Sequence, residues 1–172
     1  ADRAALAGWC TAKGRLLATM LVIPSPEGFL LQLAKDLAPT VAKRLSMFIL
    51  RSKVKISDES DAWAQYGLWD ADLPVSGVAW HDGAVTVGLG ERRFLKIGRN
   101  LSQPCAENEE RWTLQEIRAG RPWISAATQD QFVPQMVNLD LIGGVSFSIT
   151  KLDAELKKLW DLPCESVGYT KL

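Results

Sequence analysis

LAGWCTAKGRLLATMLVI, residues 6–23, places two apolar runs on either side of Lys13-Gly14, which predicts a β-hairpin. Residues 24–28 contain two prolines and a glycine and are expected to turn, and residues 29–33 are apolar enough to return as a third strand. Between residues 37 and 49, apolar side chains recur at helical spacing. The chain is therefore expected to begin as an antiparallel sheet covered by a helix.

The following segments continue this antiparallel order. Further strands are predicted at residues 53–57, 63–69, 78–80, 84–89 and 92–97. Helices are predicted at 107–119, with Trp112 and Ile117 pointing inward, and in the tail at 148–172. Asp36 is the expected N-cap of the earlier helix. This order indicates the α+β class, a mainly antiparallel sheet with helices packed on one face.

The composition excludes several classes of protein. The 172 residues suit one domain, and 20 basic against 20 acidic residues leave no net charge, so direct nucleic-acid binding is not expected. Basic clusters at residues 43–44, 51–55 and 91–96 are interpreted as solvated faces. Three scattered cysteines and one histidine form neither a metal site nor a disulfide framework, which favours the cytoplasm. No apolar run is long enough to cross a membrane, and no catalytic motif is recognised.

The irregular stretch from residue 117 to 147 holds most of the candidate binding residues. Trp123 follows a proline and is either the wall of a planar-ligand pocket or part of the loop packing. Gln135 and Asn138 carry amides that either read the edge of a heterocycle or cap loop backbone. Lys13 and Arg15 flank a hairpin glycine and either belong to an ordinary turn or reach toward an anionic ligand tail. The residues alone leave these alternatives open.

Several stretches together resemble a known family; they are residues 9–15, 50–54, 117–122, 132–139 and 143–147. They are similar to the YgfZ-type folate-binding proteins, relatives of the aminomethyltransferase (T-protein) of the glycine cleavage system. The resemblance implies a partial aminomethyltransferase-like folate-binding domain over residues 1–147, followed by a divergent helix and tail at 148–172. It also implies tetrahydrofolate as cofactor, with Lys13, Arg15, Trp123, Gln135 and Asn138 as binding residues.

The same resemblance implies a role in bacteria. Family members support iron–sulfur protein maintenance and tRNA thiomethylation, so iron–sulfur client proteins are the expected partners and contact with tRNA is expected to be indirect. Two alternatives remain: a folate-dependent aminomethyl transferase, and a degenerate or truncated member without ligand function.

Three departures from the family pattern bear on these alternatives. Ala18 and Thr19 stand where transferase members have an aspartate pair, which argues against aminomethyl transfer. Arg118 stands where the family often has a glutamate. The family's Lys-Gly-Cys-Tyr/Phe-x-Gly-Gln-Glu run is expected after residue 147, but residues 148–151 read Ser-Ile-Thr-Lys. The chain thus lacks the hallmark cysteine run, and truncation, a change of reading frame, an omitted disordered loop or real divergence would each give this pattern.

Overall fold

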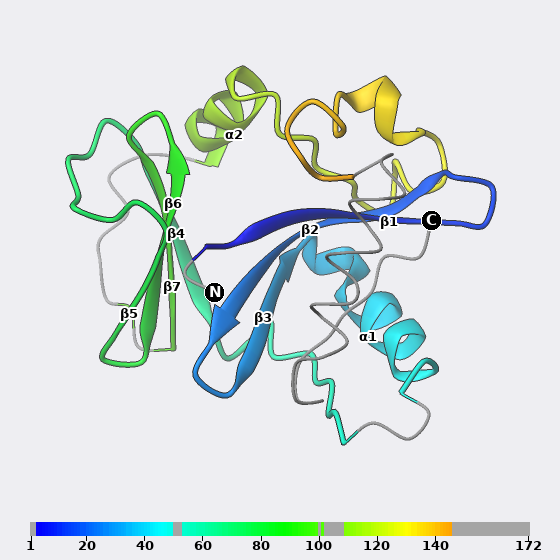
Figure 1. The fold of residues 1–172 in the computed structure, drawn as a ribbon, viewed down its shortest axis with the longest axis horizontal. Coiled ribbons are helices and arrows are strands. Elements are labelled where there is room, and N and C mark those ends of the chain that lie inside the picture. The colour runs from blue at the N-terminus through cyan, green and yellow to red at the C-terminus, as the bar shows by residue number, and fades with distance from the viewer. Residues whose placement is uncertain (1–2, 50–52, 100, 102–108, 146–172) are drawn as a thin grey trace, which may run out of the picture.

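Two antiparallel sheets and two α-helices make up the described part of the chain, which in this computed structural model is residues 3–49, 53–99, 101 and 109–145. The elements are β1 (Ala5–Cys10), β2 (Leu16–Ser25), β3 (Gly28–Leu33), η1 (Lys35–Leu37), α1 (Ala38–Ser46), β4 (Ala64–Leu68), β5 (Val78–His81), β6 (Ala84–Gly90), β7 (Arg93–Gly98), α2 (Glu109–Arg118) and η2 (Pro134–Val137). The first sheet has the strand order β1-β2-β3 and the second β4-β7-β6-β5. Figure 1 shows the two sheets side by side, with α1 beside the first and α2 above the second.

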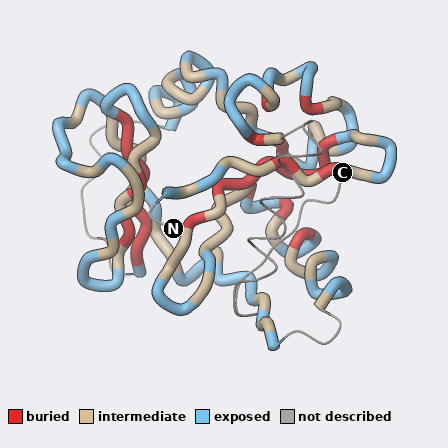
Figure 2. Tube along the Cα trace, viewed as in Figure 1, coloured by how far each residue is buried: buried red, intermediate tan, exposed pale blue. Residues whose placement is uncertain are grey.

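β2 is the central strand of the first sheet, and both of its faces are buried. On one face, Leu16, Ala18 and Met20 pack with η1 and α1. On the other face, Leu21 and Ile23 pack against side chains of the second sheet, namely Val85, Val87, Leu95 and Ile97. Figure 2 shows the buried residues following β2 and the inner strands of the second sheet. β2 therefore joins two hydrophobic clusters.

α2 is seated on the second sheet by an aromatic contact. Gly67 on β4 lies directly under the ring of Trp112, so a Cβ at this position would overlap the indole. Trp69 meets the same indole with ring centroids 6.4 Å apart. On the far edge of this sheet, the Trp80 Nε1 group donates a 2.8 Å hydrogen bond to the Pro24 carbonyl of β2. These contacts hold α2, the second sheet and β2 together.

The structure confirms a mixed helical and antiparallel fold, but it corrects the expected architecture. The single sheet is wrong: there are two sheets, each carrying its own helix, because the apolar run in β2 is buried on both faces. Residues 53–57 form no strand, although their exposure alternates as in a strand. They pair with no neighbour in the described sheets, so the alternation reflects burial without a hydrogen-bonded ladder.

Two side chains differ from their expected placement. Ile117 is 68% exposed, because it lies five residues after Trp112 and helical periodicity turns it away from the sheet. Asp36 caps no helix; its Oδ2 atom accepts a 2.9 Å hydrogen bond from the Ala126 N–H. The predicted tail at 148–172 lies outside the described residues.

Candidate functional site

The candidate site is built on the docked loop, residues 119–145, which crosses the first sheet. β3 pairs only with residues 20–25 of β2, so the preceding part of β2 has a free edge. The loop takes up this edge: Leu16 N–H donates to the Phe132 carbonyl and Asp130 N–H donates to the Leu16 carbonyl, each at 2.8 Å. The Gln129 Nε2 group adds a 2.8 Å bond to the Leu17 carbonyl. The loop thus satisfies backbone groups that an unpaired edge would leave open.

Thr19 fixes the first part of the docked loop. Its hydroxyl donates to the Pro122 carbonyl and accepts from the Ile124 N–H, both at 3.0 Å, and the residue is 1% exposed. Trp123 therefore lies between two anchored neighbours, with 46% of its surface exposed. Ala18, beside Thr19, is fully buried. Residues 18 and 19 thus supply a buried methyl group and a hydroxyl that is hydrogen-bonded to the loop backbone.

The variant Thr19→Val tests this anchor. Valine preserves the shape of the side chain but removes both hydrogen bonds, leaving the buried Ile124 N–H without a partner. We expect the free energy of unfolding to fall by about 1–3 kcal/mol. Urea denaturation measures this loss. Thr113→Val, at an exposed position on α2, is the control; equal effects of the two substitutions would contradict the anchoring role.

Leu139 closes the other end of the docked loop. It is fully buried and packs into the cluster formed by β1, β2 and α1. A Cβ on Gly8 would lie 2.5 Å from a Leu139 methyl group, so β1 accommodates the leucine only because residue 8 has no side chain. Gly8 N–H also donates a 2.9 Å bond to the Gly144 carbonyl. The loop is therefore anchored at both edges of the first sheet.

Gln135 and Asn138 lie on one turn between these anchors. They sit on η2 and at its C-cap, where Asn138 has a left-handed φ of 56° and its N–H bonds the Gln135 carbonyl at 3.3 Å. Both residues are exposed, and neither side chain hydrogen-bonds another residue in the part of the chain that the structure describes. The two amides therefore project from a turn whose backbone is fixed, without a partner among the described residues.

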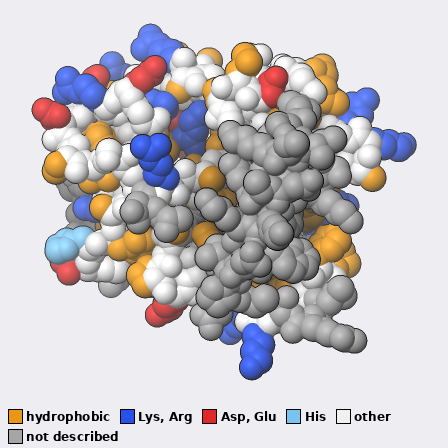
Figure 3. Space-filling model, in the orientation of Figure 1, with side chains coloured by type: hydrophobic (Ala, Val, Ile, Leu, Met, Phe, Trp, Pro, Cys, Tyr) orange, Lys and Arg blue, Asp and Glu red, His pale blue; other side chains and the backbone are white. Residues whose placement is uncertain are grey.

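The hairpin tip contributes cations to the same loop. Gly14 adopts a φ of 76°, which turns the chain between Lys13 and Arg15. The Arg15 Nη1 group donates a 3.0 Å bond to the Gln131 carbonyl. Lys13 is exposed and has no ion pair within the described residues. Figure 3 shows Lys and Arg side chains gathered at the hairpin tip. The structure thus joins Arg15 to the docked loop and places Lys13 at the border of the loop, exposed and without an ion pair among the described residues.

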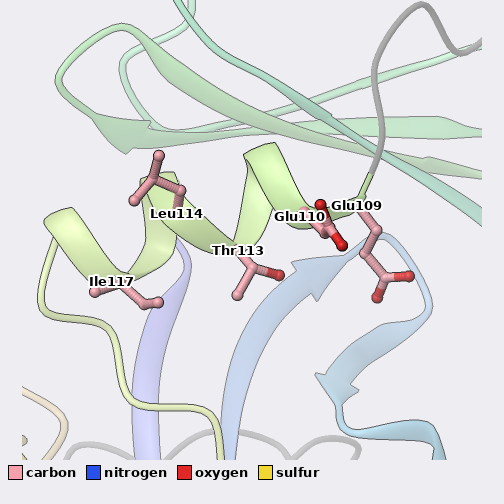
Figure 4. Close-up of a pocket in the computed structure, with 5 residues that line it drawn as sticks. All are labelled: Glu109, Glu110, Thr113, Leu114 and Ile117. Carbon is pink, nitrogen blue, oxygen red and sulfur yellow. The ribbon is translucent and has the colours of Figure 1, made fainter.

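An open groove lies elsewhere on the molecule. Its volume is about 450 Å³, and it is lined by one face of α2, namely Glu109, Glu110, Thr113, Leu114 and Ile117 (Figure 4). None of the five binding residues predicted from the sequence lines it. The groove is lined by two carboxylates at one end and by an apolar helix face. None of its lining residues carries the positive charge that would bind the carboxylates of a folate tail. The groove therefore does not replace the docked loop as the candidate site.

Sequence reasoning missed a buried arginine cluster, which consists of Arg93, Glu116 and Arg121. Glu116 Oε1 lies 2.8 Å from Arg93 Nη1, and Glu116 Oε2 lies 2.8 Å from Arg121 Nη1. The interpretation of residues 91–96 as a solvated face is wrong for Arg93, whose side chain is only 6% exposed. The position of Glu116, four residues after the inward Trp112, is the signal that its carboxylate faces the sheet.

Other kinds of site find less support. Within the described residues, no group of three histidine, cysteine or acidic side chains is placed to hold a metal ion. Cys10 is buried, and burial raises the pKa of its thiol, which lowers its reactivity. Cys105 and Cys164 lie outside the described residues. No helix in the described ranges has the length and apolar character needed to cross a membrane.

The geometry defines a class: an antiparallel α+β protein with a long loop anchored across one sheet. Comparison with known proteins finds similarity to "tRNA-modifying protein YgfZ" of Pectobacterium carotovorum subsp. carotovorum (strain PC1), 28% identical over 174 residues, covering 86% of this chain and 51% of that protein. The protein of the same description from Serratia proteamaculans (strain 568) is 27% identical over 172 residues, covering 86% of this chain and 52% of that protein. No protein-family model matches the chain.

These similarities support a YgfZ-like chain, in agreement with the resemblance seen in the sequence. The chain spans about half the length of the curated relatives it matches.

Proposed function

We propose that the chain binds tetrahydrofolate at the docked loop and acts as an accessory protein in tRNA thiomethylation, through the maintenance of iron–sulfur proteins. The observation that carries the proposal is the turn with Gln135 and Asn138, whose exposed amides have no partner among the described residues. The similarity to two proteins described as tRNA-modifying supports the biological part of the proposal. The amides would read the pterin edge, because each both donates and accepts hydrogen bonds.

Two further features of the loop support a folate ligand. Trp123 offers an exposed indole whose backbone neighbours are fixed by Thr19, and such a ring stacks on a planar heterocycle. Lys13 and Arg15 supply positive charge for the glutamate carboxylates of the ligand. Because the loop is already anchored at both edges of the first sheet, binding would not have to order it, and this increases affinity.

Equilibrium dialysis against tetrahydrofolate under reducing conditions tests the site. We expect saturable binding by the wild-type chain and an affinity about three to ten times weaker in Gln135→Ala and in Asn138→Ala, the cost of one hydrogen bond each. Gln65→Ala, which removes an exposed amide from β4 on the second sheet, is the matched control and should bind normally. Wild-type affinity in both loop variants would overturn the assignment.

An accessory role is favoured over aminomethyl transfer by Ala18 and Thr19. A buried methyl group offers no proton-transfer chemistry, and the Thr19 hydroxyl already bonds the Pro122 carbonyl and the Ile124 N–H. We therefore expect no turnover of an aminomethylated carrier protein. Expression of the chain in a bacterial strain that lacks its YgfZ relative, followed by measurement of thiomethylated tRNA, tests the biological role. Failure to restore thiomethylation would contradict the accessory role, and failure to bind folate as well would favour the degenerate-member alternative.

A further inference from the structure

The arginine cluster carries more positive charge than its single carboxylate can balance. Arg93 comes from β7, Arg121 from the start of the docked loop and Glu116 from α2, and their side chains are 6%, 13% and 15% exposed. Burial is the largest influence on the pKa of Arg121 and lowers it, while the charge of Glu116 raises it and that of Arg93 lowers it. The cluster therefore combines two guanidinium groups with one carboxylate. One positive charge is therefore left over in a largely desolvated place.

The hydrogen-bond pattern of the cluster is also incomplete. The Nε atom of Arg93 is buried and has no hydrogen-bond partner in the described part of the chain, although its N–H needs an acceptor to offset its loss of water. Among the residues that the structure describes, Arg93 donates only to Glu116 Oε1, and Arg121 reaches the same carboxylate only through Nη1. Buried polar groups in native proteins are normally paired, so an orphaned donor beside surplus charge indicates a missing acceptor.

We propose that Arg93 and Arg121 form a binding site for a single oxyanion group, a carboxylate or a phosphate. A guanidinium group presents its N–H donors in a planar fork that matches two oxygens of such a group. The anion would neutralise the surplus charge and accept from the Arg93 Nε. It would enter beside Arg121, the more exposed of the two arginines. This site is separate from the amides of the docked loop and does not depend on folate binding.

Nuclear magnetic resonance of arginine Nε–H groups in the folded wild-type chain tests the proposal. Inorganic phosphate and, separately, glutarate are titrated at constant ionic strength. We expect a saturable shift of the Arg93 resonance, which is identified by its absence in Arg93→Lys. The ratio of folded to unfolded protein should rise about 100-fold when the anion reaches about 100 times its Kd. Tighter binding of phosphate assigns the natural ligand to phosphoryl compounds, and tighter binding of glutarate assigns it to carboxylates.

Two variants separate an anion site from a structural ion cluster. Glu116→Gln removes the competing carboxylate, so phosphate should bind about ten times more tightly. Arg121→Lys replaces one planar guanidinium group by an ammonium group, which cannot donate to two oxygens at once in the same geometry, and should weaken phosphate binding about tenfold or more. No resonance shift with either anion, or a Glu116→Gln variant whose stability phosphate does not restore, would overturn the proposal. Since tetrahydrofolate is absent from these measurements, their failure is distinct from failure of the proposed function.

Discussion

Replacement of Glu116 by alanine is expected to lower the free energy of unfolding by about 3–5 kcal/mol, because it leaves two buried guanidinium groups without their shared carboxylate. The loss should be large because Glu116 joins three parts of the fold. It lies on α2 and pairs with Arg93 of β7 and with Arg121, which precedes Trp123 in the docked loop. Loss of the Glu116 carboxylate should therefore also disturb the docked loop.

Urea denaturation of Glu116→Ala and Glu109→Ala measures the effect with a control on the same helix. Glu109 is exposed in the first turn of α2, where a carboxylate contributes less than about 1 kcal/mol through the helix dipole. A loss in Glu116→Ala no larger than that in Glu109→Ala would show that the ion cluster contributes little to stability.

Leu139→Ala is expected to lower the free energy of unfolding by about 2–5 kcal/mol and to abolish binding at the docked loop. The side chain is fully buried in the cluster that includes Leu16 and Ile124, so its removal leaves a cavity. Because Gly8 and Gly144 both lie against this leucine, its loss also frees the end of the loop. The amides on η2 would then no longer sit on a fixed turn.

Leu141→Ala is the matched control for this second prediction. Leu141 is two residues away in the same loop but is 78% exposed, and its truncation should change stability by less than about 0.5 kcal/mol. Thermal or urea unfolding of both variants, followed by the dialysis measurement, separates packing from general effects of a shortened side chain. Equal stability of the two variants would show that Leu139 does not anchor the loop.

The local elements could be predicted from the sequence because their signals are local. The first hairpin is marked by Gly14, and the hairpin of β5 and β6 by Asp82-Gly83, where both residues have a positive φ as this tight turn requires. The second sheet could not be separated from the first in this way. The sequence signal for the second sheet was the apolar run in β2, which is typical of a strand buried on both faces. Such a run does not show which strands pack against it.

The candidate site was predicted only in part, since its anchors are contacts between distant residues. The sequence indicated Gln135 and Asn138, and the structure places them exposed on one turn. The role of Thr19 depends on Pro122 and Ile124, more than 100 residues along the chain, and no local pattern reports such a pairing. Arg93 was missed because a basic residue in a strand is normally solvated, and its burial depends on Glu116.

Calorimetric titration of the purified wild-type chain with tetrahydrofolate, under reducing conditions, tests the central claim most directly. The anchored loop, with Gln135 and Asn138 amides that have no partner among the described residues, predicts saturable binding of one ligand per chain. Unfolding in urea, measured on the same preparation, shows whether the sample is folded. The absence of binding heat at several temperatures from a cooperatively folded sample would contradict the claim.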